Sequence, residues 1–175
     1  MDNTSKKDQN TVAWRDAVAR YEHPSLPRSL GQIANTMLPY FALLCAMYLC
    51  LDISYWITLM LAVPAAGFVV RTFIILHDCG HGSFFKSKRA NRILGFVAGV
   101  LTFIPSYYWS HDHAKHHATA GDLDRRGTGD IWTMTTEEYL AAPRRKRLAY
   151  RIYRNPFILF IPGPVLLFLF VHRLS

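Results

Sequence analysis

Four long stretches without a charged side chain constrain what this 175-residue chain can fold into. Residues 29–51 contain no Lys, Arg, Asp or Glu over 23 positions, and residues 53–70, 93–110 and 155–172 contain none over 18 positions each. A helix needs about 20 apolar residues to cross the hydrocarbon core of a bilayer. The pattern therefore indicates an integral membrane protein, and it excludes an evenly mixed globular domain, a disordered chain and a disulfide-stapled mini-protein.

The distribution of charge predicts which side of the membrane the polar segments occupy. The net charge is +8, with five basic residues before position 29 and thirteen between Lys86 and Arg154, whereas the connection between the first two runs carries only Asp52. By the positive-inside rule, the N-terminal segment 1–28 and the long loop are cytoplasmic. In a bacterium the membrane is the plasma (inner) membrane. No base-stacking or groove-reading motif accompanies the charge, so nucleic acid is not an expected partner.

The apolar runs predict an all-α integral membrane fold. Residues 30–51 and 53–76 form an antiparallel helical hairpin, with Ser29 as the N-cap of the first helix and the prolines of 23–28 breaking the chain before it. The strongly apolar part of the third run, 93–105, is too short for a span and predicts a re-entrant or interfacial helix. Residues 156–172 form a third span, disturbed by Pro162 and Pro164.

Shorter predictions concern the polar segments. Residues 11–22 form a helix that lies on the membrane surface or packs on the cytoplasmic part. Thr135 and Glu138 match a capping box that opens a short helix through Ala142. The basic, aromatic-rich segment 143–156 fits anionic lipid headgroups, and an acidic electron donor is the alternative. Residues 121–127 form a turn-rich loop without an assigned role.

Six of the eight histidines fall between positions 77 and 117, in two groups with helical spacing. His77 and His81 stand i, i+4 in HDCGH, directly after the second apolar run. The second group, in SHDHAKHH, has i, i+3, i+4 spacing and consists of His113, His116 and His117. Each group presents its imidazoles on one helix face. Each alone is weak evidence, but two groups beside apolar segments indicate a metal site at the membrane edge. His111 is expected to point elsewhere, and His23 and His172 are interpreted as incidental.

Imidazole suits zinc, copper, iron and nickel, so the ligand type alone leaves the metal open. Five candidate ligands exceed the four of a closed zinc site, which favours two metal ions. The Glu-x-x-His motif of soluble di-iron bundles does not occur in the sequence. The pattern thus indicates a histidine-rich site of another kind.

HDCGHGSFF at 77–85, WSHDHAKHH at 109–117 and the trailing Asp130-Ile131-Trp132 resemble the first two histidine boxes of the integral-membrane fatty acid desaturases. HDCGH is most similar to the acyl-lipid type (Δ12/ω-6 or ω-3). The resemblance covers roughly residues 35–172. It implies a non-haem di-iron enzyme that uses O₂ and two electrons to leave a cis double bond in a membrane-lipid acyl chain. The implied iron ligands are His77, His81, His113, His116 and His117.

The resemblance also implies partners for this chemistry. These are membrane-lipid acyl chains and an external electron donor of the ferredoxin or cytochrome b5 type. The implied partners of the imidazole N–H groups are Asp78, Asp112, Asp122 and Asp130, although a solvated loop explains Asp112 and Asp122 equally well. The segment 93–105 is a candidate wall of the acyl channel, and plain membrane packing is the alternative.

One feature of the family pattern is missing. The family has a third histidine box, and no such box follows His117 in the sequence. Residues 29–175 are therefore expected to be the N-terminal part of a desaturase domain, truncated and inactive alone. A membrane di-iron hydroxylase or ketolase has the same kind of histidine boxes and is the alternative within the same chemical class. A histidine-rich metal transporter is disfavoured because these boxes follow the apolar segments rather than lying within them.

Overall fold

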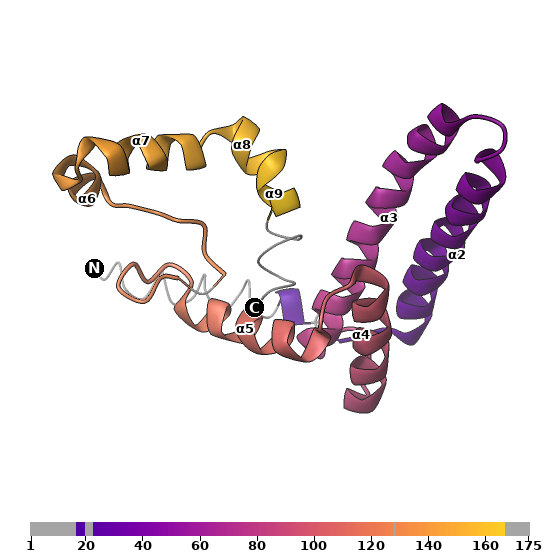
Figure 1. The fold of residues 1–175 in the computed structure, drawn as a ribbon. Helices are drawn as coiled ribbons and strands as arrows, with labels where there is room; N and C mark the ends of the chain where they lie inside the picture. Colours follow the sequence, from indigo (N-terminus) through magenta and orange to yellow (C-terminus); the bar gives the residue numbers. More distant parts are fainter. Residues whose placement is uncertain (1–16, 20–22, 128, 167–175) are drawn as a thin grey trace. The chain divides into compact units, whose positions relative to one another are not determined.

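The computed structural model describes residues 17–19, 23–127 and 129–166, and every regular element among them is helical (Figure 1). The chain divides into two compact units, Met1–Ser110 and His111–Ser175. Residues 17–19 are helical, as the helix predicted over 11–22 requires, and the rest of that helix lies outside the described residues, as does His172. The all-α fold class is confirmed.

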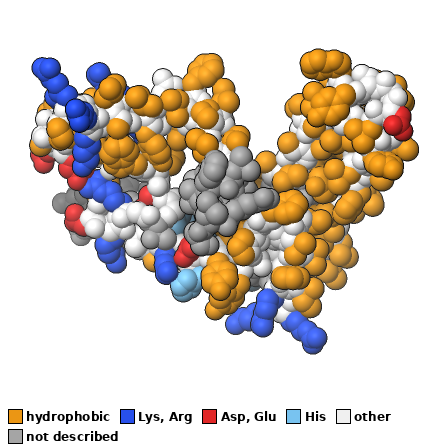
Figure 2. All heavy atoms as spheres, viewed as in Figure 1, with side chains coloured by type: hydrophobic (Ala, Val, Ile, Leu, Met, Phe, Trp, Pro, Cys, Tyr) orange, Lys and Arg blue, Asp and Glu red, His pale blue; other side chains and the backbone are white. Residues whose placement is uncertain are grey.

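The first unit is built on a helical hairpin. Helix α2 (Leu26–Cys50) and helix α3 (Tyr55–Gly80) pack side by side and are joined by residues 51–54 (Figure 1). Both are long and apolar enough to cross a membrane. Hydrophobic side chains cover the visible surface of the hairpin (Figure 2), which is the surface that lipid requires. The predicted hairpin is therefore present.

The predicted start of the first helix is wrong. Helix α2 begins at Leu26 rather than after Ser29, and Ser25 occupies the N-cap with extended backbone angles. Proline is tolerated in the first turn because the amide groups there have no intrahelical acceptor, so Pro27 does not stop the helix. Ser29 has another role: its hydroxyl donates to the carbonyl oxygen of Phe84 at 2.6 Å, in a buried position.

Helices α4 (Lys88–Thr102) and α5 (Ser106–Thr119) replace the third apolar run. They are bent by 102° at a short break, which is the geometry of a broken span or a re-entrant segment and agrees with the prediction for 93–105. The break begins at Phe103, whose φ of 57° is left-handed. Gly99 permits the close return of the chain, because a Cβ there would lie 2.6 Å from the carbonyl oxygen of Ile104.

Between Thr119 and Leu166, the described part of the second unit contains four shorter helices: α6 (Thr136–Ala141), α7 (Arg144–Tyr153), α8 (Pro156–Phe160) and α9 (Pro162–Leu166). The capping box is confirmed, since Thr135 Oγ1 accepts from the Glu138 amide at 3.1 Å and Glu138 Oε2 accepts from the Thr135 amide at 2.8 Å. The described part of the predicted third span is broken at Ile161, as expected from its prolines. Its remainder lies beyond residue 166.

The buried core of the first unit lies at one end of the hairpin. Ile75, Cys79 and Phe84 form one cluster, and Leu76, Ala98 and Ile104 form another. Both clusters include residues from the last turns of α3, directly around the first histidine group. At the other end of the hairpin the apolar side chains are exposed, Trp56 and Met60 among them. Packing therefore concentrates where the histidines are.

Candidate metal centre

The first histidine pair stands at the C-terminal end of α3. The helix continues through the HDCG sequence to Gly80, so His77 and His81 share one face, with ring centroids 4.5 Å apart. The amide of His81 donates to the carbonyl oxygen of His77 at 3.1 Å, and Gly82, with φ of 70°, then turns the chain away. Two imidazoles are thus held at the edge of an apolar helix, where HDCGH predicts them.

The Asp78 carboxylate orients the first of these rings. Its Oδ1 lies 3.0 Å from Nδ1 of His77. An imidazole whose Nδ1–H is given to a carboxylate keeps its Nε2 unprotonated and available for a metal. The predicted partnership of Asp78 with an imidazole is therefore seen.

Aromatic and small residues fix the same ring from the other side. Trp109, in the first turn of α5, lies 5.7 Å from His77 and makes an edge-on contact with Phe73 at 5.2 Å. Gly80 allows this approach, because a Cβ there would lie 3.0 Å from Oγ of Ser110. His77 is consequently bounded by packed side chains, whereas His81 is exposed.

The loop after the first pair is tied down by two buried polar contacts. Ser29 donates to Phe84, as described above. Asn91, which is 4% exposed, accepts from the amide of Phe85 and donates to its carbonyl oxygen, both at 2.8 Å. These contacts connect the starts of α2 and α4 to the residues that follow HDCGH. Sequence reasoning did not identify Ser29 or Asn91 in these roles.

The second histidine group lies on α5, which begins in the first unit and continues into the second. Nε2 of His113 and Nε2 of His117 are 3.0 Å apart. Two nitrogens that bind one ion at about 2.1 Å each, with an angle near 90° at the metal, are separated by about 3 Å. The pair therefore has the spacing of two ligands to a common cation.

His116 is held differently from its neighbours. Its Nδ1 lies 3.0 Å from Oδ1 of Asp130, and Gly129, with φ of 72°, brings the loop against the ring. The second Asp130 oxygen accepts from the amide of Gly127 at 3.2 Å. The predicted partnership of Asp130 with an imidazole is seen, and it again leaves an Nε2 for a metal.

The other predicted imidazole partners belong to the solvated surface. Asp112 pairs with Lys115 at 3.5 Å, and Asp122 pairs with Arg125 at 2.7 Å. The Arg125 contact and the Asp124 amide lower the pKa of the Asp122 carboxyl. His111 and His23 are exposed. The loop alternative therefore describes Asp122, whereas Asp112 is exposed on helix α5.

Arg71 is a polar feature of the hairpin whose contacts the sequence did not specify. Its Nη2 donates to Oδ1 of Asn35 at 2.7 Å, and its Nε donates to Oγ1 of Thr36 at 3.4 Å. The three residues link α3 to α2, and Thr36 is buried whereas Arg71 and Asn35 are exposed. A charged residue within an apolar run is the sequence signal for such a contact.

The donor set of the two groups suits a transition metal. Among the described residues, the His77–His81 pair on α3 and the His113–His117 pair on α5 each offer imidazole nitrogens that could bind a metal ion. Neutral imidazole favours iron, copper, nickel or zinc over magnesium or calcium. Carboxylates that accept hydrogen bonds from imidazole N–H groups, as Asp78 and Asp130 do, are the usual accessory groups of such sites.

Comparison with known proteins decides the family. The family model described as "Fatty acid desaturase" matches residues 53–175, which include both histidine groups. The chain belongs to the fatty acid desaturase family. Within that family, a fatty acid desaturase of Bacillus subtilis is 56% identical over 158 residues, which is 90% of this chain and 45% of that protein.

More distant desaturases are also similar to the chain. The sn-1 oleoyl-lipid 12-desaturase of Synechocystis sp. is 32% identical over 74% of this chain and 33% of that protein. The sn-1 acyl-lipid omega-3 desaturase (ferredoxin) of the same organism is 38% identical over 38% of this chain and 18% of that protein. This desaturase chain thus spans less than half the length of these curated relatives. No solved structure matches it.

The comparisons and the structure confirm some of the predictions from the sequence and support others. The recognition of the family is confirmed, and the hydroxylase, ketolase and transporter alternatives are not favoured. The prediction of a membrane protein is supported by two helices of spanning length within residues 23–166, or three if the bent pair of α4 and α5 counts as one span. A cluster of histidines could hold a metal.

Proposed function

We propose that this desaturase chain is part of an O₂-dependent enzyme that inserts a cis double bond into the acyl chain of a membrane lipid. The observation that carries the proposal is the placement of two histidine groups on the faces of α3 and α5, next to long apolar helices. The relatives named as acyl-lipid desaturases support the same reaction class.

We further propose that the two groups bind two iron ions. The proposed ligands are His77, His81, His113, His116 and His117. Iron, when bound, supplies the oxidative chemistry that removes hydrogen from an unactivated chain. The protein's own contribution is to fix the imidazoles: Asp78 accepts a hydrogen bond from Nδ1–H of His77, and Asp130 accepts one from Nδ1–H of His116.

One face of α4 is the proposed guide for the acyl chain. Gly95, Ala98 and Gly99 are buried on the opposite face, within the packed unit. Phe96 and Val100 are exposed, and they stand four residues apart on a common apolar stripe. An exposed apolar stripe is the kind of surface that an acyl chain requires, and lipid contact alone would need the same composition.

The proposed topology and partners follow from the charge and from the relatives. The N-terminus and both histidine groups lie on the cytoplasmic side, which in a bacterium is the inner face of the plasma membrane. Reducing equivalents come from an external donor of the ferredoxin or cytochrome b5 type. Relatives whose names include ferredoxin support the first of these.

The experiment uses the complete protein that carries this chain, expressed in a host without the corresponding unsaturated lipid. His→Ala at each of the five proposed ligands is expected to reduce the new double bonds below detection and to lower bound iron. His111→Ala, on the same α5 but exposed and outside the group, is the matched control and retains both. Survival of iron and products in the five variants contradicts the site, and oxygenated acyl chains contradict desaturation.

A further inference from the structure

Helix α7 has one face that packs within its own unit. The ring of Tyr150 lies 5.2 Å from Trp132 and 5.8 Å from Tyr139, and the ring of Tyr153 lies 5.8 Å from Trp132. The two tyrosine hydroxyls accept from backbone amides, Tyr150 from Met134 at 3.4 Å and Tyr153 from Trp132 at 3.5 Å. These contacts set the rotation of α7 relative to the preceding segment.

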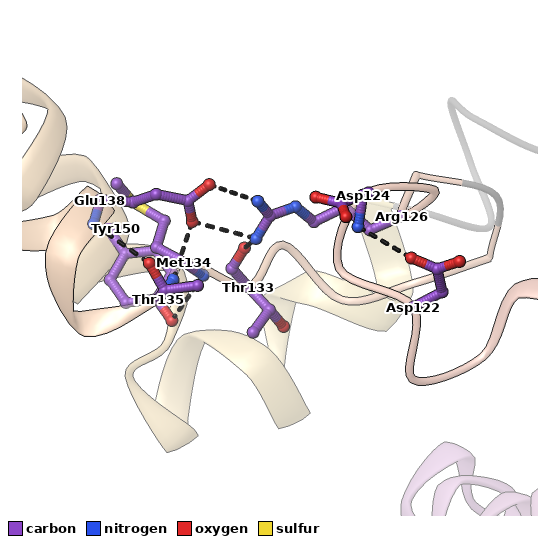
Figure 3. A network of polar contacts seen from close by, with 8 residues as sticks. All are labelled: Asp122, Asp124, Arg126, Thr133, Met134, Thr135, Glu138 and Tyr150. Carbon is purple, nitrogen blue, oxygen red and sulfur yellow. Dashed lines mark hydrogen bonds and ion pairs between the residues drawn. The ribbon is translucent and has the colours of Figure 1, made fainter.

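A polar network holds that preceding segment in place (Figure 3). The Arg126 guanidinium pairs with the Glu138 carboxylate and donates to the carbonyl oxygen of Thr133 at 2.7 Å. Glu138 also completes the capping box with Thr135. The loop, α6 and the tyrosine face of α7 are therefore one connected structure, and the opposite face of α7 is directed away from it.

The opposite face combines aliphatic and cationic side chains. Leu148 is 59% exposed and Ile152 is 49% exposed, one turn apart. At about 100° per residue, Arg144 and Arg145 lie within roughly 60° of the centre of this pair, whereas Lys146 and Arg147 lie more than about 100° from it. Residues 144–154 contain six basic and no acidic residues. Basic and hydrophobic side chains adjoin one another over this part of the unit (Figure 2).

We propose that this face of α7, made of Arg144, Arg145, Leu148 and Ile152, binds a membrane surface that contains anionic lipid. Two exposed aliphatic side chains flanked by arginines match a bilayer interface, where the aliphatics enter the acyl boundary and the guanidinium groups meet phosphates. An acidic protein partner would match the positive charge of this face, but it would not explain why the aliphatic side chains of Leu148 and Ile152 are exposed there. The chain continues directly into α8, whose Phe157 and Phe160 are about three-quarters exposed, so the apolar surface continues beyond α7.

This inference goes beyond the proposed reaction, because it concerns neither metal nor acyl-chain chemistry. It is tested on the full chain in nanodiscs of phosphatidylcholine alone or with phosphatidylglycerol added. Cys45, Cys50 and Cys79 are replaced by serine or alanine, and an environment-sensitive fluorophore is attached to Leu148→Cys. The fluorophore is expected to shift to the blue when anionic lipid is present and to lose that shift in high salt. The same label at Glu137→Cys on α6 is expected to stay insensitive.

Two double variants that remove the same charge test whether the response depends on this face of α7 or only on the net charge of the helix. Arg144→Gln with Arg145→Gln is expected to weaken the lipid-dependent response by roughly fivefold for each arginine. Lys146→Gln with Arg147→Gln removes the same charge from the other side of the helix and is expected to have a clearly smaller effect. Equal losses, or no response to anionic lipid, overturn the proposal. A response only to an added acidic ferredoxin also overturns it and assigns the face to an electron donor.

Discussion

The two histidine groups of this desaturase chain are presented by differently built scaffolds. The first stands on the last turn of α3, where Ile75 and Leu76 are 0% and 1% exposed. The second stands on α5, where none of the residues is buried, and a contact between His116 and Asp130 joins it to the following loop. Histidine pairs with the same ring separation, 4.5 Å, thus stand on a helix end that is packed into a core and on a helix that makes a polar contact with a loop.

The largest difference in the free energy of unfolding is expected when a leucine is truncated to alanine in each of the two units. Leu76→Ala should lower the free energy of unfolding by about 2–5 kcal/mol, because it leaves a cavity in a fully packed site. Leu140→Ala, in α6 of the second unit, removes the same atoms from a side chain that is 65% exposed and should cost less than about 0.5 kcal/mol. Thermal unfolding in detergent measures both. Equal losses would mean that the second unit has a core of its own.

A smaller effect is expected from the two carboxylates that orient the imidazoles. Asp78→Asn and Asp130→Asn should each weaken Co²⁺ or Fe²⁺ binding to the complete protein by roughly 10- to 100-fold, because the ring loses its charged acceptor. The two variants should differ in how well their backbone amides are protected from hydrogen exchange. Hydrogen exchange of residues 126–131 should accelerate in Asp130→Asn, which also removes the acceptor of the Gly127 amide, whereas α3 should be unchanged in Asp78→Asn. Faster exchange in α3 would contradict the idea that its core holds the pair.

The smallest effect is the pH dependence of the second unit. The Thr135 amide and then the Arg126 guanidinium lower the pKa of the Glu138 carboxyl from its ordinary 4.5. Because the folded pKa is the lower one, the stabilisation is complete above pH 4.5 and is lost as the pH falls through the lowered value. Hydrogen exchange in α6, corrected for intrinsic rates, should therefore rise below pH 4.5.

Two variants test the assignment to Glu138. Glu138→Gln should remove most of this pH dependence, and Glu137→Gln, the adjacent residue in the same first turn, should retain it. Exchange that is independent of pH in the unaltered chain would contradict the role of the carboxylate. The packed end of the hairpin offers the contrast, because the residues of its two clusters carry no carboxyl group to titrate.

Local patterns explain how much of this arrangement the sequence could predict. The i, i+4 spacing of His77 and His81 and the capping box of Thr135 and Glu138 depend only on helix geometry, and both are present as predicted. These two spacings need no knowledge of how distant segments pack. Asp130, in contrast, was identified through the resemblance of Asp130-Ile131-Trp132 to the family pattern, and its contact with His116 is present.

Features that depend on packing were not predictable in the same way. Ser29 was expected to cap a helix, yet its hydroxyl meets a carbonyl oxygen 55 residues away, at Phe84. The contact of Arg71 with Asn35 depends on the rotation of two helices about each other, which composition does not specify. The predicted start of α2 failed because prolines mark a break in a sequence but are also tolerated in the first turn of a helix.

The unbroken course of α3 has a mechanical consequence. A single helix of 26 residues, about 39 Å long at 1.5 Å per residue, includes both the apolar segment and the first two histidines, with no loop between them. In a bilayer, a helix longer than the hydrocarbon layer adjusts to a thinner one by tilting. A tilt of α3 moves His77 and His81 with it, so membrane thickness, which depends on lipid composition, acts directly on the position of these two proposed ligands.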